Sequence, residues 1–150
     1  MKLSRDLRDF ITLLNSIGVK YLLVGGHAVA YHGHPRFTGD IDFFVERSPA
    51  NADRLAALLQ SFGFGGLGIL AEDFLEPEVV IQLGRPPNRI DLLTGIDGVD
   101  FAAAWENRVT AEMDGLPVFL IGRADLIRNK RATARPQDLA DLHWIEEPLE

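Results

Sequence analysis

The stretch YLLVGGHAVAYHGHPRFTGDIDFFV, residues 21–45, holds the features that decide the fold. It opens with a short apolar segment that ends in the glycine pair Gly25-Gly26, and it closes with DIDFFV. Short apolar runs bounded by glycine are typical of buried strands, so residues 19–25 and 40–45 are each predicted to contain one. Between them, the glycine pair and residues 27–33 are predicted to form a tight turn into a short helix.

Asp40 and Asp42 alternate with apolar residues in the second of these strands. Residues two apart in a strand point to the same face, about 6–7 Å apart along the chain. Two carboxylates at that separation repel each other, and each raises the pKa of the other unless a cation lies between them. Mg²⁺ prefers oxygen ligands and usually takes one or two carboxylates together with substrate phosphates. The pair therefore predicts a metal site, with the polar edge of a strand as the alternative.

A third carboxylate and a phosphate site complete this prediction. Asp91 lies between Ile90 and Leu92, as expected of a core strand that carries one acid on its open face. Three acids can hold two metal ions about 3.5–4 Å apart, which clamp the attacking and leaving oxygens of a phosphoryl displacement. The glycine pair allows close approach of the backbone, and the amino end of the following helix is a natural site for phosphate.

The rest of the chain predicts an alternation of helices and strands. Helices are expected at 5–16 after Ser4, at 50–64 after Ser48-Pro49, at 99–108 and from Arg123 onward, where the last helix runs from Pro136 to Trp144. Two strands are expected at 79–84 and 88–96, and a hairpin at 109–121 around Asp114-Gly115. Residues 65–78 are expected to form an irregular rim. This order predicts one α/β (α+β) domain over residues 1–150, with a mixed β-sheet flanked by helices.

The amino-acid composition excludes several classes of protein. The chain has 150 residues, of which 47% are hydrophobic and 25% charged, as in an ordinary globular domain. It contains no cysteine, which excludes disulfides and thiolate zinc sites and suits a reducing compartment. No apolar run approaches the ~18 residues of a membrane span, and the start MKLSRDLRDF has no signal-peptide core, so we expect a cytoplasmic protein. The net charge of −7 argues against broad binding to nucleic acid.

The motifs of the opening stretch resemble those of a known superfamily. Gly25-Gly26, a gap of thirteen residues and the acid-apolar-acid strand are similar to the signature of the nucleotidyltransferases related to polymerase beta, and Ile90-Asp91-Leu92 is similar to their later acid. The version here resembles the minimal and AbiEii-like bacterial members, some of which belong to toxin–antitoxin pairs. Residues 125–145 are similar to the tail of that group, in which a lysine precedes an Arg-x-x-Asp segment.

The resemblance implies a nucleotidyltransferase-like fold and transfer of a nucleoside monophosphate from an NTP, such as ATP, to an acceptor hydroxyl. The acceptor is an RNA, a protein or a small molecule, and the cofactor is Mg²⁺ or Mn²⁺. The implied catalytic and metal-binding residues are Asp40, Asp42 and Asp91, and the implied nucleotide-binding residues are Gly25, Gly26, His27, Arg36, Thr38 and Lys130.

One departure from the superfamily pattern keeps a second hypothesis open. Many members have a serine after the first glycine, whereas Gly26 and then His27 follow here, and the chain has little room for an acceptor-binding domain. The alternative is a catalytically inactive module of the same fold that acts through contacts with a toxin or antitoxin partner. His27, His32 and His34 match no strong zinc spacing, and we expect structural roles for them, although His27 opens the predicted helix near the phosphates.

Overall fold

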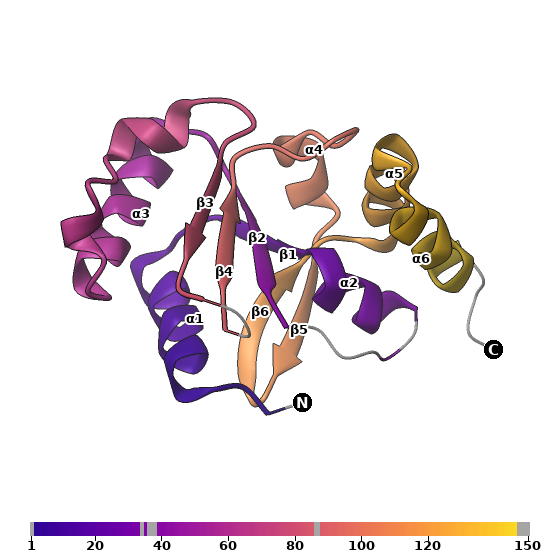
Figure 1. Ribbon diagram of the computed structural model, residues 1–150, viewed down its shortest axis with the longest axis horizontal. Coiled ribbons are helices and arrows are strands. Elements are labelled where there is room, and N and C mark those ends of the chain that lie inside the picture. Colours follow the sequence, from indigo (N-terminus) through magenta and orange to yellow (C-terminus); the bar gives the residue numbers. More distant parts are fainter. Residues whose placement is uncertain (1, 34, 36–38, 86–87, 147–150) are drawn as a thin grey trace.

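A computed structural model describes residues 2–33, 35, 39–85 and 88–146 of the chain (Figure 1). Its centre is a six-stranded sheet in the order β3-β4-β2-β1-β6-β5. The strands are β1 (Tyr21–Val24), β2 (Ile41–Val45), β3 (Val80–Leu83), β4 (Ile90–Leu93), β5 (Val109–Met113) and β6 (Leu116–Leu120). Strand β2 is parallel to β4 and antiparallel to β1, while β1 is parallel to β6. The sheet is therefore mixed, as the sequence predicts.

Helices lie on both faces of this sheet. They are α1 (Arg5–Ile17), α2 (Gly25–His32), α3 (Pro49–Ser61), α4 (Phe101–Glu106), α5 (Arg123–Thr133) and α6 (Pro136–Glu146), with short 3-10 helices η1 (Gly65–Leu67) and η2 (Ala71–Leu75). Figure 1 shows α1 and α3 to the left of the strands and α2, α5 and α6 to the right. The α/β class with helices flanking the sheet is confirmed.

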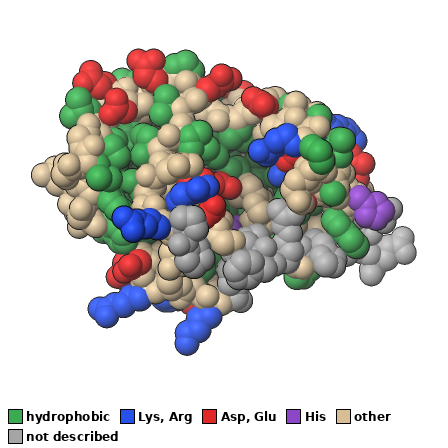
Figure 2. Space-filling view, viewed as in Figure 1, with side chains coloured by type: hydrophobic (Ala, Val, Ile, Leu, Met, Phe, Trp, Pro, Cys, Tyr) green, Lys and Arg blue, Asp and Glu red, His purple; other side chains and the backbone are tan. Residues whose placement is uncertain are grey.

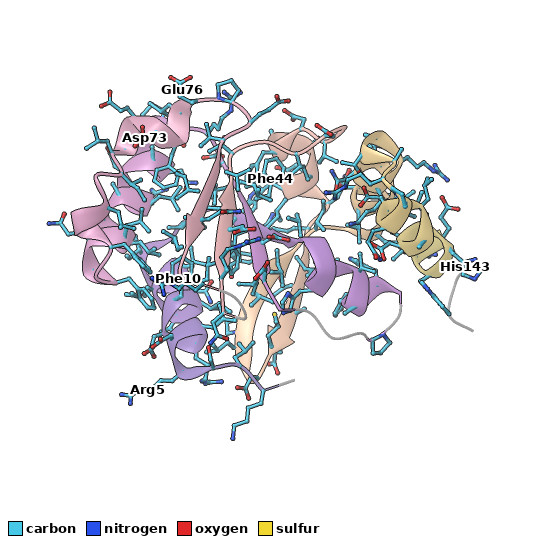
Figure 3. The ribbon with its side chains drawn as sticks, viewed as in Figure 1. Arg5, Phe10, Phe44, Asp73, Glu76 and His143 are labelled. Atoms are coloured by element: carbon cyan, nitrogen blue, oxygen red, sulfur yellow. The ribbon has the colours of Figure 1, made fainter. Side chains whose placement is uncertain are left out.

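Aromatic contacts show which face of β2 belongs to the core under α1. Phe43 lies 5.8 Å from Phe10 of α1 and 5.5 Å from Tyr21 of β1, measured between ring centroids. Phe44 points to the opposite face and meets Phe101 of α4 at 5.0 Å (Figure 3). Because side chains alternate along a strand, Asp42 shares the face of Phe44, away from the core under α1.

The helix boundaries follow local signals in the sequence. Ser4 accepts a hydrogen bond from the Leu7 amide and so caps α1, which ends at Gly18 in the left-handed region. Ser48 and Pro49 begin α3 as predicted, but this helix ends at Ser61, before Gly63 at φ +91°, and not at residue 64. None of the described helices is long and apolar enough to cross a membrane.

Two further segments test the predicted turns. Asp114 and Gly115 both have positive φ, 51° and 79°, which suits the tight β5–β6 hairpin. Residues 65–78, predicted to be irregular, instead form η1 and η2, and Phe74 of η2 is fully buried. Burial of that ring fixes the segment against α3, which the weak periodicity of the sequence did not predict.

Candidate active site

Four polar residues face one another at the adjacent amino ends of β2 and β4. The parallel register of these strands pairs Asp42 with Asp91, and Ile41 with Ile90. One position earlier, Asp40 therefore lies across from Arg89, whose carbonyl accepts the Ile41 amide at 3.1 Å. Because residues two apart share a face, the structure brings the three predicted acids together with one arginine.

Arg89 bridges the two strands through ion pairs. Its Nη2 atom lies 2.8 Å from Oδ2 of Asp40 and 3.3 Å from Oδ2 of Asp91, and its Nε atom lies 3.0 Å from Oδ1 of Asp91. The sequence analysis did not identify Arg89. The signal was present, since Arg89 and Asp91 are two residues apart on a predicted strand and must share a face.

The arrangement raises the pKa of Asp42. Burial, the charge and hydrogen bond of Asp91, and the charge of Asp40 raise the pKa of Asp42 to about 6, and Arg89 only partly opposes them. The group of three carboxylates and one guanidinium is therefore short of positive charge. A cation bound near Asp42 would relieve this deficit.

Gly25 places the first turn of α2 against Asp42. It has φ +67°, a region that favours glycine, and a Cβ atom at this position would clash with Oδ2 of Asp42. The sequence predicted a glycine turn ahead of the helix, whereas α2 begins at Gly25 itself, because Val24 already supplies the extended N-cap. Only glycine allows the amino end of α2 to approach the carboxylate this closely.

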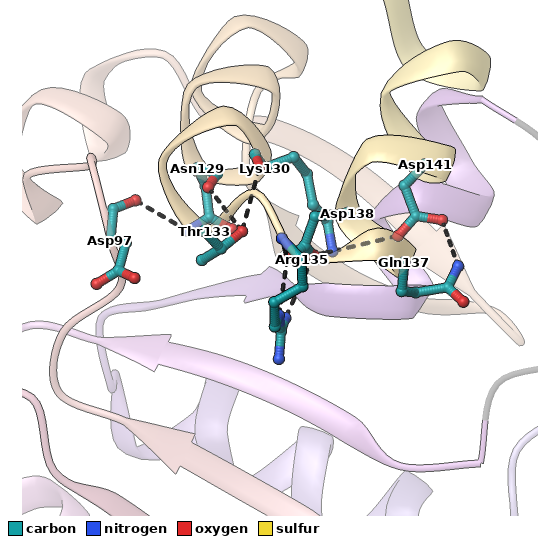
Figure 4. A network of polar contacts seen from close by, with 8 residues as sticks. All are labelled: Asp97, Asn129, Lys130, Thr133, Arg135, Gln137, Asp138 and Asp141. Atoms are coloured by element: carbon teal, nitrogen blue, oxygen red, sulfur yellow. Dashed lines mark hydrogen bonds and ion pairs between the residues drawn. The ribbon is translucent and has the colours of Figure 1, made fainter.

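A cavity of about 330 Å³ opens beside this group of residues. Asp42 and Gly25 line one side, and residues at the carboxyl end of β4 and beyond line another. The remaining wall comes from α5 and the turn that follows it (Figure 4). The lining residues are Val24, Gly25, Asp42, Leu93, Gly95, Ile96, Asp97, Asn129, Lys130, Thr133 and Arg135.

Two cations on the α5 side of the cavity are held by acids of α6. Buried Lys130 places its Nζ atom 3.1 Å from Oδ1 of Asp138 and 3.4 Å from Oδ2 of Asp141. Arg135 donates to Asp138 from Nε at 2.7 Å and from Nη2 at 3.2 Å, while its side chain remains 72% exposed. Burial opposes ionisation of Asp138, but hydrogen bonds from Arg135, Thr133 and Lys130 outweigh it and hold the pKa of this carboxyl well below its usual range.

Lys130 lines the cavity, as a nucleotide-binding residue would, and its charge is shared with two carboxylates. Its predicted role as a phosphate ligand stays a prediction. Arg135 is the more accessible cation on the same wall. Arg135 is the arginine of the Arg-x-x-Asp segment, for which the sequence predicted no separate role.

Gly26 and His27 are the other predicted nucleotide-binding residues that the structure describes. His27 is buried, burial lowers its pKa, and neither it nor Gly26 is among the described residues that line the cavity. His32 donates from Nε2 to the Ile121 carbonyl at 2.7 Å, which is a structural role. Arg36, Thr38 and His34 fall outside the described residues, and their predicted roles stay predictions.

Within the described ranges, no group of three or more histidine, aspartate or glutamate side chains is already arranged to hold a metal ion. Asp40, Asp42 and Asp91, at the amino ends of neighbouring strands, do not form such a group. Separately, the Arg89 guanidinium forms ion pairs with oxygen atoms of Asp40 and Asp91. The metal-binding role of the three acids remains a prediction.

Comparison with known proteins addresses the family of the chain. No curated protein matches it. A family model described as "Nucleotidyltransferase of unknown function (DUF6036)" matches residues 2–147. That description does not extend to the AbiEii-like group, so the narrower assignment stays a prediction. Because the match covers nearly the whole chain, including both acid-bearing strands and the α5–α6 segment, the protein belongs to this nucleotidyltransferase family.

Proposed function

We propose that the protein is a metal-dependent enzyme that transfers a nucleoside monophosphate from an NTP to an acceptor hydroxyl. The observation that carries this proposal is the cavity that joins Asp42 and Gly25 on one side to Lys130 and Arg135 on the other. Carboxylates suit metal ions, while a helix amino end and cations suit phosphates. Both kinds of group border one space, as transfer from a metal-bound triphosphate requires.

The donor set fits Mg²⁺ or Mn²⁺. Asp40, Asp42 and Asp91 offer carboxylate oxygens, which are the ligands that hard divalent cations prefer. The raised pKa of Asp42, caused first by burial and then by its acidic neighbours, indicates a local excess of negative charge. When bound, the metal would offset charge on the phosphates and favour ionisation of the acceptor hydroxyl.

The residues of the chain would position and polarise the substrates. The acceptor hydroxyl oxygen attacks the α-phosphorus of the NTP. The bond between the α-phosphorus and the oxygen that bridges it to the β-phosphate breaks, and pyrophosphate leaves. Asp91 would accept the hydroxyl proton. The amides at the start of α2, exposed through Gly25, would donate to the triphosphate, and Arg135 would clamp it from the opposite wall.

The surface charge of the protein limits which kinds of acceptor can bind. Exposed acids on and next to η2 (Glu72, Glu76 and Glu78) accompany the acidic side chains that gather along the upper edge of the face in Figure 2, and Figure 3 labels Glu76 at this edge. This edge disfavours an extended RNA, so we infer a protein or small molecule, or an RNA end that needs only the local cations of the cavity. Pairing with a toxin or antitoxin partner is the biological setting that we propose from the superfamily resemblance.

One observation favours an inactive interaction module as the second candidate. Arg89 already neutralises part of the negative charge on Asp40 and Asp91, so these acids can persist without a metal. In that case the protein would bind neither metal nor NTP, and would act through its surface alone.

Calorimetric titration with each NTP, with and without Mg²⁺, separates the two candidates. We expect Mg²⁺-dependent binding by the wild type and its loss in the Asp40→Asn/Asp42→Asn variant. Asp53→Asn, an exposed change on α3, is the control and should bind as the wild type does. A folded wild type that binds no NTP would exclude the enzyme and favour the interaction module.

A further inference from the structure

We propose that Arg89 is an internal counter-cation that competes with the divalent metal, and that it must release Asp40 before the three carboxylates can share a metal ion. The inference rests on the proposed metal-dependent function. It concerns a residue that the sequence motifs do not include, and it assigns to that residue control of metal affinity.

The contacts of Arg89 are those of a bridging cation. A single nitrogen, Nη2, reaches carboxylates on both strands, at 2.8 Å from Asp40 and 3.3 Å from Asp91. The Nε atom adds a second contact to Asp91 at 3.0 Å. Arginine stays protonated at all pH values at which proteins fold, so this positive charge cannot be removed by titration.

These contacts conflict with metal binding in two ways. Carboxylate oxygens that are engaged by a guanidinium, in ion pairs or hydrogen bonds, have fewer lone pairs to offer a metal. A fixed positive charge only a few ångströms away also repels a divalent ion.

Arg89 can leave by a movement of its side chain alone. The residue precedes β4, which begins at Ile90, and its carbonyl is held by the Ile41 amide at 3.1 Å. The side chain is 28% exposed, so its guanidinium already contacts solvent. Release of Asp40 therefore needs rotation about side-chain bonds, with no change in the pairing of β2 and β4.

The arrangement also explains how the site tolerates the absence of metal. Asp40, Asp42 and Asp91 on facing strands repel one another, and Arg89 compensates two of them. Loss of the arginine would thus have opposite effects on two properties. Metal affinity would rise, and the stability of the metal-free protein would fall.

Mn²⁺ titration followed by the electron paramagnetic resonance of the free ion tests this inference. We expect Arg89→Gln to bind Mn²⁺ about tenfold more tightly than the wild type, because one nearby positive charge is removed. Arg89→Lys keeps the charge but loses the bridging fork, and should tighten binding about two- to threefold. Arg85→Gln is the matched control: it removes the same charge from an exposed position in the same connection and should change affinity less than twofold.

The outcomes distinguish the inference from the function on which it rests. If the wild type binds Mn²⁺ and Arg89→Gln binds no tighter, or more weakly, Arg89 supports the acids and does not compete, and the inference is wrong. If neither protein binds Mn²⁺ while both are folded, the proposed function fails and the inference fails with it. Should Arg89→Gln not fold without metal, the Arg89→Lys comparison decides: tighter binding supports competition, and unchanged or weaker binding contradicts it.

Discussion

Asp42 of β2 and Asp91 of β4 are direct partners in the parallel strand register, so their side chains lie on the same face of the sheet. Arg89 forms ion pairs with Asp40 and Asp91, and it only partly offsets the burial and acidic neighbours that raise the pKa of Asp42. Repulsion between the two acids lowers the stability of the metal-free protein, whereas the same two carboxylates would serve as ligands for a bound metal ion. The predictions below follow from that conflict and from the polar wall that faces it.

Asp42→Asn should stabilise the metal-free protein at neutral pH. Burial and the neighbouring acids raise the pKa of Asp42 to about 6, so the folded protein binds this proton more tightly than the unfolded chain does. Its contribution to stability is then fully present below a pH of about 4 and is lost as the pH rises through about 6. We expect a gain of about 1–2 kcal/mol in the free energy of unfolding at pH 7.5, allowing for partial exposure of the carboxyl.

Urea unfolding in EDTA between pH 4.5 and 8 measures this effect. The wild type should lose stability across that window relative to Asp42→Asn. The exposed change Asp53→Asn should leave the wild-type profile unaltered. Parallel profiles for the wild type and Asp42→Asn would show that Asp42 does not titrate in this range.

Gly25→Ala should destabilise the fold more than Gly18→Ala does. Both glycines have positive φ, 67° and 83°, so each change strains the backbone by about 1 kcal/mol. An added Cβ at Gly18 meets nothing within 4 Å, whereas at Gly25 it clashes with the Asp42 carboxylate, which adds about 1–3 kcal/mol. Chemical denaturation of both variants measures the difference. Equal losses would mean that Asp42 moves away without cost.

Lys130→Met should cost about 3–5 kcal/mol, because it leaves the buried carboxylates of Asp138 and Asp141 without their shared cation. Arg131→Met, on the same helix, breaks an exposed pair with Glu146 and should cost less than about 1 kcal/mol. Thermal unfolding compares the two variants. A small loss for Lys130→Met would indicate that Lys130 is available to a ligand after all.

Arg135→Gln should weaken NTP binding about tenfold, since one cation is lost from the cavity wall, and should cost less stability than Lys130→Met. Its side chain is largely exposed, and Asp138 keeps its contact with Lys130. Calorimetric titration of the NTP and thermal unfolding separate the two effects. Arg131→Gln serves as the control, with NTP binding expected to be unchanged. Equal NTP affinities for Arg135→Gln and the wild type would remove Arg135 from the nucleotide site.

The sequence predicted what depends on local periodicity. The alternation of acids and apolar residues predicted that Asp40 and Asp42 share one face and that Asp91 lies on the open face of a core strand, and the capping residues Ser4 and Ser48 set helix starts correctly. Alternation and capping are short-range effects, so they can be read from a few residues at a time.

Contacts between segments far apart in the sequence could not be predicted from a few residues at a time. The pairing of Lys130 with two acids depends on how α6 folds back on α5, and burial of Phe74 depends on the position of α3. The link from Arg89 to Asp40 likewise exists only because β4 pairs with β2. Each of these contacts depends on which segments pack together, which the local pattern of the sequence does not specify.

The central claim, that these three acids bind the metal of a nucleotide complex, is tested most directly by anomalous X-ray diffraction from crystals grown with Mn²⁺ and a non-hydrolysable NTP analogue. The account predicts an Mn²⁺ peak among Asp40, Asp42 and Asp91, triphosphate density in the cavity beside Gly25 and Arg135, and Arg89 turned away from Asp40. A structure in which the analogue is absent and Arg89 still bridges Asp40 and Asp91 at saturating Mn²⁺ would contradict it.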